Sequence, residues 1–497
     1  MIAWLLPLIG ALTLVAAWWS PGSPSCVALG WTSLAFFYAG LRDPRRRMLR
    51  MFIAGVITYT GGFYWLYSTI KDFGGFPTAA AIAIFLLYVV GSAVQFVIWG
   101  FSWGFLPAIT TRLGLRTATA WLIAHHFWIK IFPWDFGHTQ IGFPLFAQLA
   151  GVLGVTGITF IMMWMVEALC ARKQVAPLAL AASVVSFGAS LAYGFWIQDA
   201  LAKHPSSPLS TVMIQGNVSL QRKHDMTFFT VNREQYLKIS ALVAQKDSLV
   251  IWPESTITEF IPANTRDARQ ATILPFLNNG SAFLVGGLTF LSNTEYFNSS
   301  ILIRPDGTVD APYNKIILMP FGEYTPLASW FPWLEEINST AGQFTPGSGP
   351  KVLSFTLSDN RPVKLSPLIC YEDVVPSIAR QATNQGAELL INQTNDAWFG
   401  DTVAPYQHHM IASFRAIENR RYLLRSTNTG LTAVVDPFGK TLASLLPYTE
   451  SVLPMEISLL QYRSTYTALP ISIVWLLLAA VLALKVVATR ISTRAKR

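Results

Sequence analysis

Charged side chains are scarce in this sequence. Asp, Glu, Lys and Arg make up only 13% of its 497 residues, whereas apolar residues make up 52%. An ordinary soluble domain carries roughly twice that charged fraction. The scarcity excludes a disordered chain and predicts a protein of the lipid bilayer. The formal net charge of +9 would suit a nucleic-acid-binding protein, so its distribution along the chain has to be considered.

Cysteine is scarcer still, with three residues in the whole chain. So few cysteines exclude a disulfide-stapled scaffold, and no pair has the spacing of a structural zinc site or a redox motif. Cys26 and Cys170 lie in apolar runs, which leaves Cys370 as the only cysteine outside them. Internal repeats and low-complexity segments are also lacking, which excludes a solenoid.

The charges that are present are unevenly distributed. Residues 201–460 carry 19 basic and 22 acidic side chains, whereas the other 237 residues carry 17 basic and 5 acidic ones. The charge-poor part consists of apolar runs, several of which reach the roughly 20 residues needed to cross a hydrocarbon core. These runs are approximately 2–18, 26–41, 51–70, 78–107, 117–132, 146–170, 176–196 and 470–488. They predict seven transmembrane helices within residues 1–200 and an eighth at 470–489.

The basic residues of the membrane part predict its orientation. With a cytoplasmic N-terminus, they gather in inner loops 42–50, 109–116 and 171–175 and after residue 488, and the outer loops hold almost none. This asymmetry follows the positive-inside rule. It predicts cytoplasmic termini, a basic tail at 490–497, and a domain outside the cytoplasmic membrane at 205–465. Since the positive charge belongs to loops that set topology, we expect no nucleic-acid partner.

Residues 205–465 alternate between β-rich runs and helical patterns. The β-rich runs are 211–215, 248–252, 283–286, 300–304, 365–370, 389–392 and 432–436, and the helical patterns include 232–244, 374–381 and 410–422. Alternation of this kind predicts a layered α/β domain with a buried sheet. About 250 residues are enough for such a domain to bury its own core.

Three reactive side chains lie at or near the ends of apolar segments of this domain. Glu254 lies just past the run 248–252, Cys370 ends the run 365–370, and Lys315 interrupts an apolar stretch. In layered α/β proteins, reactive groups gather at the carboxyl ends of strands. A thiol at a strand-to-helix turn also lies near amide N–H groups that can lower its pKa. A carboxylate can take the thiol proton and an ammonium can stabilise an oxyanion, so the set predicts acyl chemistry.

Each of these residues also has an ordinary structural interpretation. A buried cysteine is usually inert, and a lone Glu or Lys is usually solvated. A different mechanism is open as well, because His408 and His409 follow Cys370 in the order of a papain-like Cys–His pair. Adjacent residues on a helix point about 100° apart, so at most one would face the thiol. We expect a capping or surface role for both histidines.

The residues around these three positions resemble a known family. Trp252-Pro-Glu254, Lys315 and Cys370-Tyr-Glu372 resemble the Glu–Lys–Cys triad of the nitrilase, or carbon–nitrogen hydrolase, superfamily. Longer segments narrow the resemblance: Gln215-Gly-Asn217, Pro320-Phe-Gly-Glu323-Tyr-Thr-Pro326, Asn395-Asp-Ala-Trp-Phe-Gly400, Arg425-Ser-Thr-Asn-Thr-Gly430 and Asp436-Pro-Phe-Gly-Lys440. With the eight membrane spans, they are similar to the apolipoprotein N-acyltransferase family over nearly the whole chain. The resemblance implies a nitrilase-like αββα sandwich inserted into a polytopic α-helical membrane domain.

The resemblance also implies a ping-pong acyl transfer and a role for each residue. The Cys370 thiolate would take an acyl chain from the sn-1 ester of a phospholipid as a thioester, and the α-amine of an S-diacylglyceryl-cysteine apolipoprotein would then accept it. Glu254 would be the general base, and Lys315 with the backbone N–H of Tyr371 would form the oxyanion hole. Glu323 and Glu372 would support the site. Glu323 as an ordinary loop carboxylate, and Tyr371 and Glu372 as helix-entry residues, are the alternatives.

A thioester hydrolyses unless water is kept from it, which predicts a cover over the site. The candidates are the loops that carry Trp330 and Trp333 and the segment Trp398-Phe399, as lids or as loops that rest on lipid. Ordinary core packing of these aromatic residues is the alternative. His224 stands where many relatives carry a tryptophan, so a contact to lipid is expected to differ there.

Two other functions stay open at this point. A membrane-tethered nitrilase-type amidase would share the triad and pass the acyl group to water. A transporter or receptor with a ligand-binding outer domain is the other, although intramembrane charge is sparse. We expect no metal or organic cofactor, bacterial inner-membrane localisation with a periplasmic catalytic domain, and a monomer.

Overall fold

The computed structural model describes residues 2–320, 322–325, 330 and 343–469, and it separates into two compact units. The first unit comprises Met1–Tyr67, Thr78–Lys203 and Ser464–Arg497, and the second comprises Ser68–Pro77 and His204–Arg463. The end of the expected span 51–70 and the loop 71–77 that follows it thus group with the second unit.

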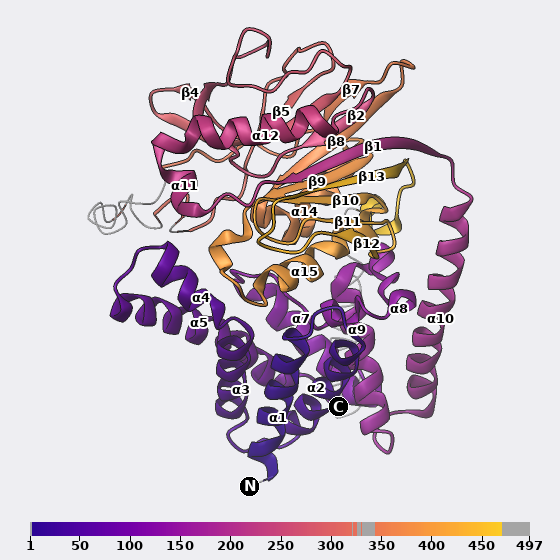
Figure 1. Cartoon of the computed structure of the whole chain (residues 1–497). Helices are drawn as coiled ribbons and strands as arrows, with labels where there is room; N and C mark the ends of the chain where they lie inside the picture. Colours follow the sequence, from indigo (N-terminus) through magenta and orange to yellow (C-terminus); the bar gives the residue numbers. More distant parts are fainter. Residues whose placement is uncertain (1, 321, 326–329, 331–342, 470–497) are drawn as a thin grey trace. The chain divides into compact units, whose positions relative to one another are not determined.

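The first unit is helical (Figure 1). Its helices are α1 (Ile2–Trp18), α2 (Pro24–Leu41), α3 (Arg47–Gly62), α4 (Trp65–Ser68, which ends in the second unit), α5 (Thr78–Phe105), α6 (Ala108–Arg112), α7 (Arg116–Phe127), α8 (Pro144–Ala147), α9 (Ala150–Cys170), α10 (Pro177–Ala202) and α16 (Thr465–Ala468). Within the described residues, α2, α5, α9 and α10 are long and apolar enough to cross a membrane, and α1 is a shorter apolar helix.

Three of the eight expected spans differ from the structure or lie outside the described residues. The run 51–70 is divided between α3, which has 16 residues, α4 and a short π-helix at Thr69–Phe73, and α3 is not among the helices long and apolar enough to cross a membrane. The run 117–132 forms a helix of only 12 residues, α7, which at 1.5 Å per residue is about 18 Å long and too short to cross a hydrocarbon core by itself. The run 470–488 lies outside the described residues. On α5 and α10, Leu87, Leu178 and Val185 are exposed by 73%, 82% and 68%, as expected of side chains that face lipid.

Asp135 joins three parts of the first unit. Its buried carboxylate Oδ1 accepts hydrogen bonds from Trp121 Nε1 (3.0 Å), Phe136 N (2.9 Å) and Thr159 Oγ1 (2.6 Å). A Cβ on nearby Gly137 would lie 2.4 Å from Val155 O, so only glycine allows this close approach. The segment around Asp135 and Gly137 therefore holds parts of the helical unit together.

The second unit contains two sheets. One has the strand order β13-β1-β2-β4-β5-β6, with β3 paired to β4, and the other has the order β12-β11-β10-β9-β8-β7. The strands of the first are β1 (Ser206–Gln215), β2 (Ser248–Ile251), β3 (Ile257–Pro262), β4 (Ala282–Ser292), β5 (Glu295–Ile303), β6 (Tyr313–Asn314) and β13 (Ser451–Leu460). Those of the second are β7 (Leu353–Thr356), β8 (Pro362–Ile369), β9 (Leu389–Thr394), β10 (Tyr422–Thr427), β11 (Ala433–Val435) and β12 (Thr441–Ser444). The parallel strands β1, β2 and β4 lie in one sheet and β8, β9 and β10 in the other.

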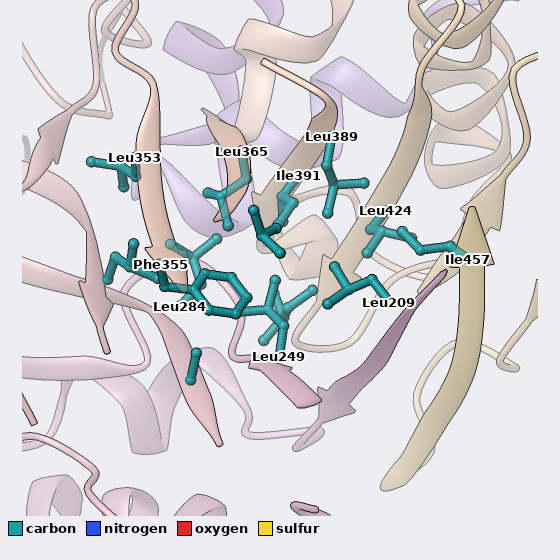
Figure 2. Close-up of a cluster of buried hydrophobic side chains, with 14 of the residues drawn as sticks. Leu209, Leu249, Leu284, Leu353, Phe355, Leu365, Leu389, Ile391, Leu424 and Ile457 are labelled. Atoms are coloured by element: carbon teal, nitrogen blue, oxygen red, sulfur yellow. The ribbon is translucent and has the colours of Figure 1, made fainter. Parts of the chain in front are cut away.

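The two sheets pack face to face around an aliphatic core. Alternate residues of each strand point inward, and Figure 2 shows leucine and isoleucine side chains from both sheets meeting there. The outer faces are covered by helices (Figure 1): α12 (Phe229–Val243) packs on the first sheet, and α14 (Pro376–Asn384) and α15 (Ala404–Asn419) pack on the second. The predicted αββα sandwich is confirmed.

The predicted strands and helices of this unit agree with the structure except at two places. The helix expected at 410–422 ends at Asn419, because Arg420 adopts a left-handed conformation with φ 54°, and strand β10 then begins at Tyr422. The helix expected at 374–381 begins at Pro376, which occupies its first turn, where proline is tolerated. Cys370–Val374 instead form a short 3-10 turn, η4.

Candidate active site

Cys370 lies at the turn that joins the carboxyl end of β8 to η4. Its φ of 52° is in the left-handed region, which is uncommon for a residue with a side chain. Such strain is retained only where the surroundings impose it, and here the amide of Asn392 on β9 donates to Cys370 O at 2.9 Å. Burial, reinforced by the negative charges of Glu254 and Glu323, raises the pKa of the Cys370 thiol above its ordinary value, although Lys315 and Thr394 oppose the shift. The thiol is therefore protonated at rest.

Glu254 lies three residues beyond the end of β2 and is 7% exposed. Its carboxylate Oε1 accepts hydrogen bonds from Asn298 Nδ2 at 2.8 Å and from Lys315 Nζ at 3.2 Å. The next residue, Ser255, has a φ of 46°, so the chain turns sharply as soon as it leaves the sheet. This turn rests against Gly286 of β4, where a Cβ would lie 2.2 Å from Pro253 O.

Lys315 follows the short strand β6 and is 2% exposed. Its ammonium contacts two carboxylates, Glu323 Oε2 at 2.8 Å and Glu254 Oε1 at 3.2 Å. Burial opposes the charged form, but Glu254, Glu323 and Cys370 outweigh burial and hold the pKa of Lys315 well above its ordinary value. The lysine is therefore a cation fixed between two anions.

Glu323 lies in this cluster rather than on a solvated loop. Besides Lys315, its carboxylate accepts Asn298 Nδ2 and Met319 N, both at 2.8 Å. The amide of Asn298 thus bridges Glu323 and Glu254.

Glu372 supports the site through hydrogen bonds to the segments around it. Its carboxylate accepts Tyr313 Oη at 2.6 Å, Ile369 N at 2.7 Å and Ile316 N at 2.5 Å. These bonds tie the end of β8 to the segment that carries Lys315. Burial raises the pKa of Glu372 to about 7, against the hydrogen bonds and the charge of Lys315. The neighbouring Tyr371 has its pKa raised by burial as well.

His408 and His409 have partners other than the thiol. His408 lies between two buried aspartates, with Nε2 2.6 Å from Asp373 Oδ1 and Nδ1 3.2 Å from Asp396 Oδ1. Arg425 contacts the same two aspartates at 3.5 and 3.8 Å. His409 Nε2 is 2.8 Å from Thr441 Oγ1. Because both ring nitrogens of His408 are engaged, a papain-like Cys–His pair is not formed, and His408 lies in a buried ionic network rather than on the surface.

The residues expected to form a lid or to contact lipid differ in their exposure. Trp330 is 77% exposed, and Trp333 lies outside the described residues. Trp398 and Phe399 form the short turn η5 (Asp396–Phe399) and are half-buried. Trp398 O accepts Thr69 Oγ1 at 2.9 Å, and the ring of Phe399 lies 6.2 Å from that of His408. His224 is the last residue of α11 (Leu220–His224).

Two residues of the cluster were missed by sequence reasoning. Asn298 is buried in β5, and the polar run Asn298-Ser-Ser inside an otherwise apolar strand is the signal that could have found it. Lys223 precedes His224, and its ammonium donates to Glu254 O at 2.8 Å. Burial lowers the pKa of Lys223 to about 8, although Glu254 and Cys370 oppose the shift.

The cluster can support nucleophilic catalysis by the thiol. It places a carboxylate and an ammonium where both interact electrostatically with the cysteine thiol. Proton transfer followed by oxyanion stabilisation requires these three groups. Within the part of the chain that the structure describes, no three His, Cys, Asp or Glu side chains are grouped so that they could hold a metal ion.

Two sheets enclosed by helices, with Glu254, Lys315 and Cys370 at strand ends, define the second unit as a carbon–nitrogen hydrolase domain, and residues 226–467 match that family. Residues 10–168 match the apolipoprotein N-acyltransferase N-terminal domain. The chain belongs to the apolipoprotein N-acyltransferase family, and it is a membrane-associated acyltransferase.

Curated relatives match this sequence over most of its length. The apolipoprotein N-acyltransferase of Pseudomonas putida is 30% identical over 454 residues, 87% of each chain. That of Geobacter metallireducens is 29% identical over 475 residues, 89% of this chain and 88% of the relative. An amidase from Nesterenkonia sp., of known structure, is 21% identical, with a TM-score of 0.37, over 53% of this chain and 93% of the amidase.

Proposed function

We propose that this enzyme transfers a fatty acyl chain from the sn-1 position of a phospholipid to the α-amine of the S-diacylglyceryl cysteine of apolipoproteins. Family membership supports the N-acylation of lipoproteins. The observation that carries the chemistry is the convergence of Glu254, Lys315 and the strained Cys370 on one buried cluster.

In the first half-reaction, the resting thiol needs a base because its pKa is raised. Glu254 takes the proton of Cys370 as the sulfur attacks the ester carbonyl, and the carbonyl oxygen becomes negative. Lys315 and the backbone N–H of Tyr371 stabilise this oxyanion. When the intermediate collapses, the C–O bond to glycerol breaks, the leaving oxygen receives the proton from Glu254, and a lysophospholipid departs. Cys370 is left as a thioester.

In the second half-reaction, the lipoprotein amine attacks the thioester. Glu254 takes a proton from the attacking nitrogen, the C–N bond forms, and the sulfur leaves and regains a proton. Glu323 and Asn298 keep Glu254 and Lys315 in position in both half-reactions. Glu372 fixes the backbone of the segment that follows Lys315. Trp330, Trp333, Trp398, Phe399 and His224 are the proposed contacts to the acyl chain or the lid.

The proposed setting follows from the distribution of charge. The enzyme lies in the bacterial inner membrane as a monomer, with residues 1–200 and 470–489 spanning the bilayer. Both termini, including the basic tail 490–497, are cytoplasmic, and the catalytic domain, residues 205–465, is periplasmic. Basic residues in the loops 42–50, 109–116 and 171–175 support this orientation.

The test uses purified full-length protein with fluorescent phosphatidylethanolamine and a diacylated lipopeptide. We expect a hydroxylamine-labile label on Cys370 that moves to the lipopeptide amine, and no label in Cys370→Ser. Free fatty acid without N-acylated peptide would indicate the runner-up, a membrane-tethered hydrolase of the nitrilase type. Absence of any covalent label would contradict both and favour a binding protein.

A further inference from the structure

Lys223 is a second cation next to the reacting groups. It lies in α11, on the segment that connects β1 to α12, and its Nζ donates to Glu254 O at 2.8 Å. The electrostatic interactions of its ammonium are with Glu254, Cys370 and Lys315. Lys223 therefore places a second ammonium at the backbone of Glu254.

Lys223 compensates part of the negative charge of the cluster. Lys315 contacts two carboxylates, those of Glu254 and Glu323, which leaves one negative charge in excess. Lys223 offsets that charge. Without it, a second anion entering the site would meet a net negative charge in a partly desolvated setting, where repulsion is poorly screened.

The ammonium of Lys223 also has hydrogen-bonding capacity to spare. An ammonium has three N–H donors, and among the described residues Glu254 O is the only atom that accepts one of them. The residue is partly exposed, so two donors beside the catalytic pair are available to a substrate. Lys315, in contrast, contacts two carboxylates and keeps one donor, which the proposed oxyanion role requires.

We propose that Lys223 binds the phosphodiester of the acyl-donor lipid. This inference rests on the proposed function, in which the donor is a phospholipid ester. A phosphodiester is an anion whose oxygens accept charge-assisted hydrogen bonds from an ammonium. The acceptor is different: an S-diacylglyceryl cysteine has no phosphate. Lys223 thus serves the first half-reaction and has no phosphate to bind in the second.

The test compares two acyl donors on the full-length protein in detergent micelles. One donor is phosphatidylethanolamine, and the other is a neutral p-nitrophenyl ester of the same fatty acid. The rate of thioester formation on Cys370 is followed by intact mass for the wild type, Lys223→Met, Lys223→Arg and Lys238→Met. Lys238 is the matched control, because it is a lysine of the same unit whose side chain is 79% exposed, beside Glu234.

We expect Lys223→Met to lower acylation by phosphatidylethanolamine at least tenfold more than acylation by the neutral ester, in line with loss of a charge-assisted bond. Lys223→Arg, which keeps the positive charge, should recover most of the loss, and Lys238→Met should behave as the wild type. Transfer from an acyl-enzyme preformed with the neutral ester to the lipopeptide should show no comparable selective loss.

Other outcomes would overturn the inference. Equal losses with both donors would mean that Lys223 acts only by holding Glu254, and no loss with either would mean that it is not used. Wild-type protein that is acylated by the neutral ester but not by phosphatidylethanolamine would refute the proposed donor, and the inference with it. Wild-type protein that is acylated by neither would refute Cys370 as the nucleophile.

Discussion

The amide of Asn298 and the ammonium of Lys315 together fix the position of the Glu254 carboxylate. Both donate to the same carboxylate oxygen, and both also contact Glu323. Lys315 is thus shared between two carboxylates rather than paired with Glu254 alone. The position of the proposed base therefore depends on Glu323, a residue that need not touch the substrate.

Replacement of Glu323 by glutamine tests this sharing of charge. We expect acylation of Cys370 to slow by about tenfold or more, because Lys315 and Asn298 would lose the carboxylate that holds them in position against Glu254. The same change should lower the pKa of the thiol, since Glu323 is one of the groups that raise it. Iodoacetamide labelling of Cys370 against pH, resolved from Cys26 and Cys170 by peptide mapping, measures that pKa. A slower acylation with an unchanged or higher thiol pKa would contradict the explanation.

At the scale of elements, the site depends on a close approach between β4 and the turn after β2. A Cβ at Gly286 would lie 2.2 Å from Pro253 O, 2.7 Å from Ser255 N and 2.8 Å from Glu254 Cα. All three are backbone atoms, which cannot move aside without moving the carboxylate. The adjacent Gly287 has its nearest neighbours at 3.5 Å, and they are side-chain atoms.

These two glycines form a matched pair for mutation. We expect Gly286→Ala to reduce the rate of Cys370 acylation by more than tenfold, since a displacement of about 1 Å at a catalytic group has a large effect. Gly287→Ala should retain activity within about threefold. Acylation kinetics on detergent-purified protein give the comparison, and similar losses in both variants would show that β4 is merely intolerant of substitution.

The His408 network joins four elements: η4, η5, α15 and β10. Burial and Arg425 disfavour the charged imidazole, but Asp373 and Asp396 outweigh them and raise the pKa of His408 to about 9. The charged ring therefore holds the turn of Cys370, through Asp373, and the turn of Trp398, through Asp396. Its neighbour His409 has its pKa lowered by burial to about 3 and stays neutral.

This network predicts how stability depends on pH. The pKa of His408 is higher in the folded state than the value of about 6.5 expected on unfolding. Its contribution is thus complete below about pH 6.5 and is lost as the pH rises through about 9. We expect the difference in thermal unfolding midpoint between wild type and His408→Gln to be largest near pH 6 and to shrink above pH 9. A difference that stays constant over this range would mean that His408 is uncharged in the fold.

At the scale of the whole molecule, the distribution of basic residues and the exposure of apolar side chains both indicate that the helical unit lies in a membrane. Apolar side chains on α5 and α10 are exposed, which is costly in water and favourable in lipid. The second unit encloses its apolar residues between sheets and helices instead. One chain thus combines a part that needs the bilayer with a part that has its own core.

The proposed orientation is tested with single cysteines in a Cys26→Ser, Cys170→Ser, Cys370→Ser background, which removes all three native cysteines. Ser292 and Arg45 are both exposed positions, the first at the end of β4 and the second in the basic loop 42–50. We expect a membrane-impermeant maleimide to label Ser292→Cys in intact spheroplasts, and Arg45→Cys only after lysis. Labelling of Arg45→Cys before lysis would reverse the orientation.

The sequence by itself predicted a membrane part, the α/β class of the second unit, and the positions of Glu254, Lys315 and Cys370 close to strand ends. These are local properties, because hydrophobic length, charge distribution and the end of a strand are each visible within a few consecutive residues. It also anticipated Glu323 and Glu372, through the resemblance. It misjudged the length of the helix at 117–127 and the environment of His408.

Only the tertiary structure decided the partners of these groups. Asn298 reaches Glu254 across 44 residues of chain, Lys223 reaches it across 31, and Asp373 reaches His408 across 35. Such contacts depend on which strands pair and in which register, and a polar residue in a strand or a lysine in a connecting segment carries no local sign of them. The position of each reactive group could therefore be predicted, but the contacts that set its charge could not.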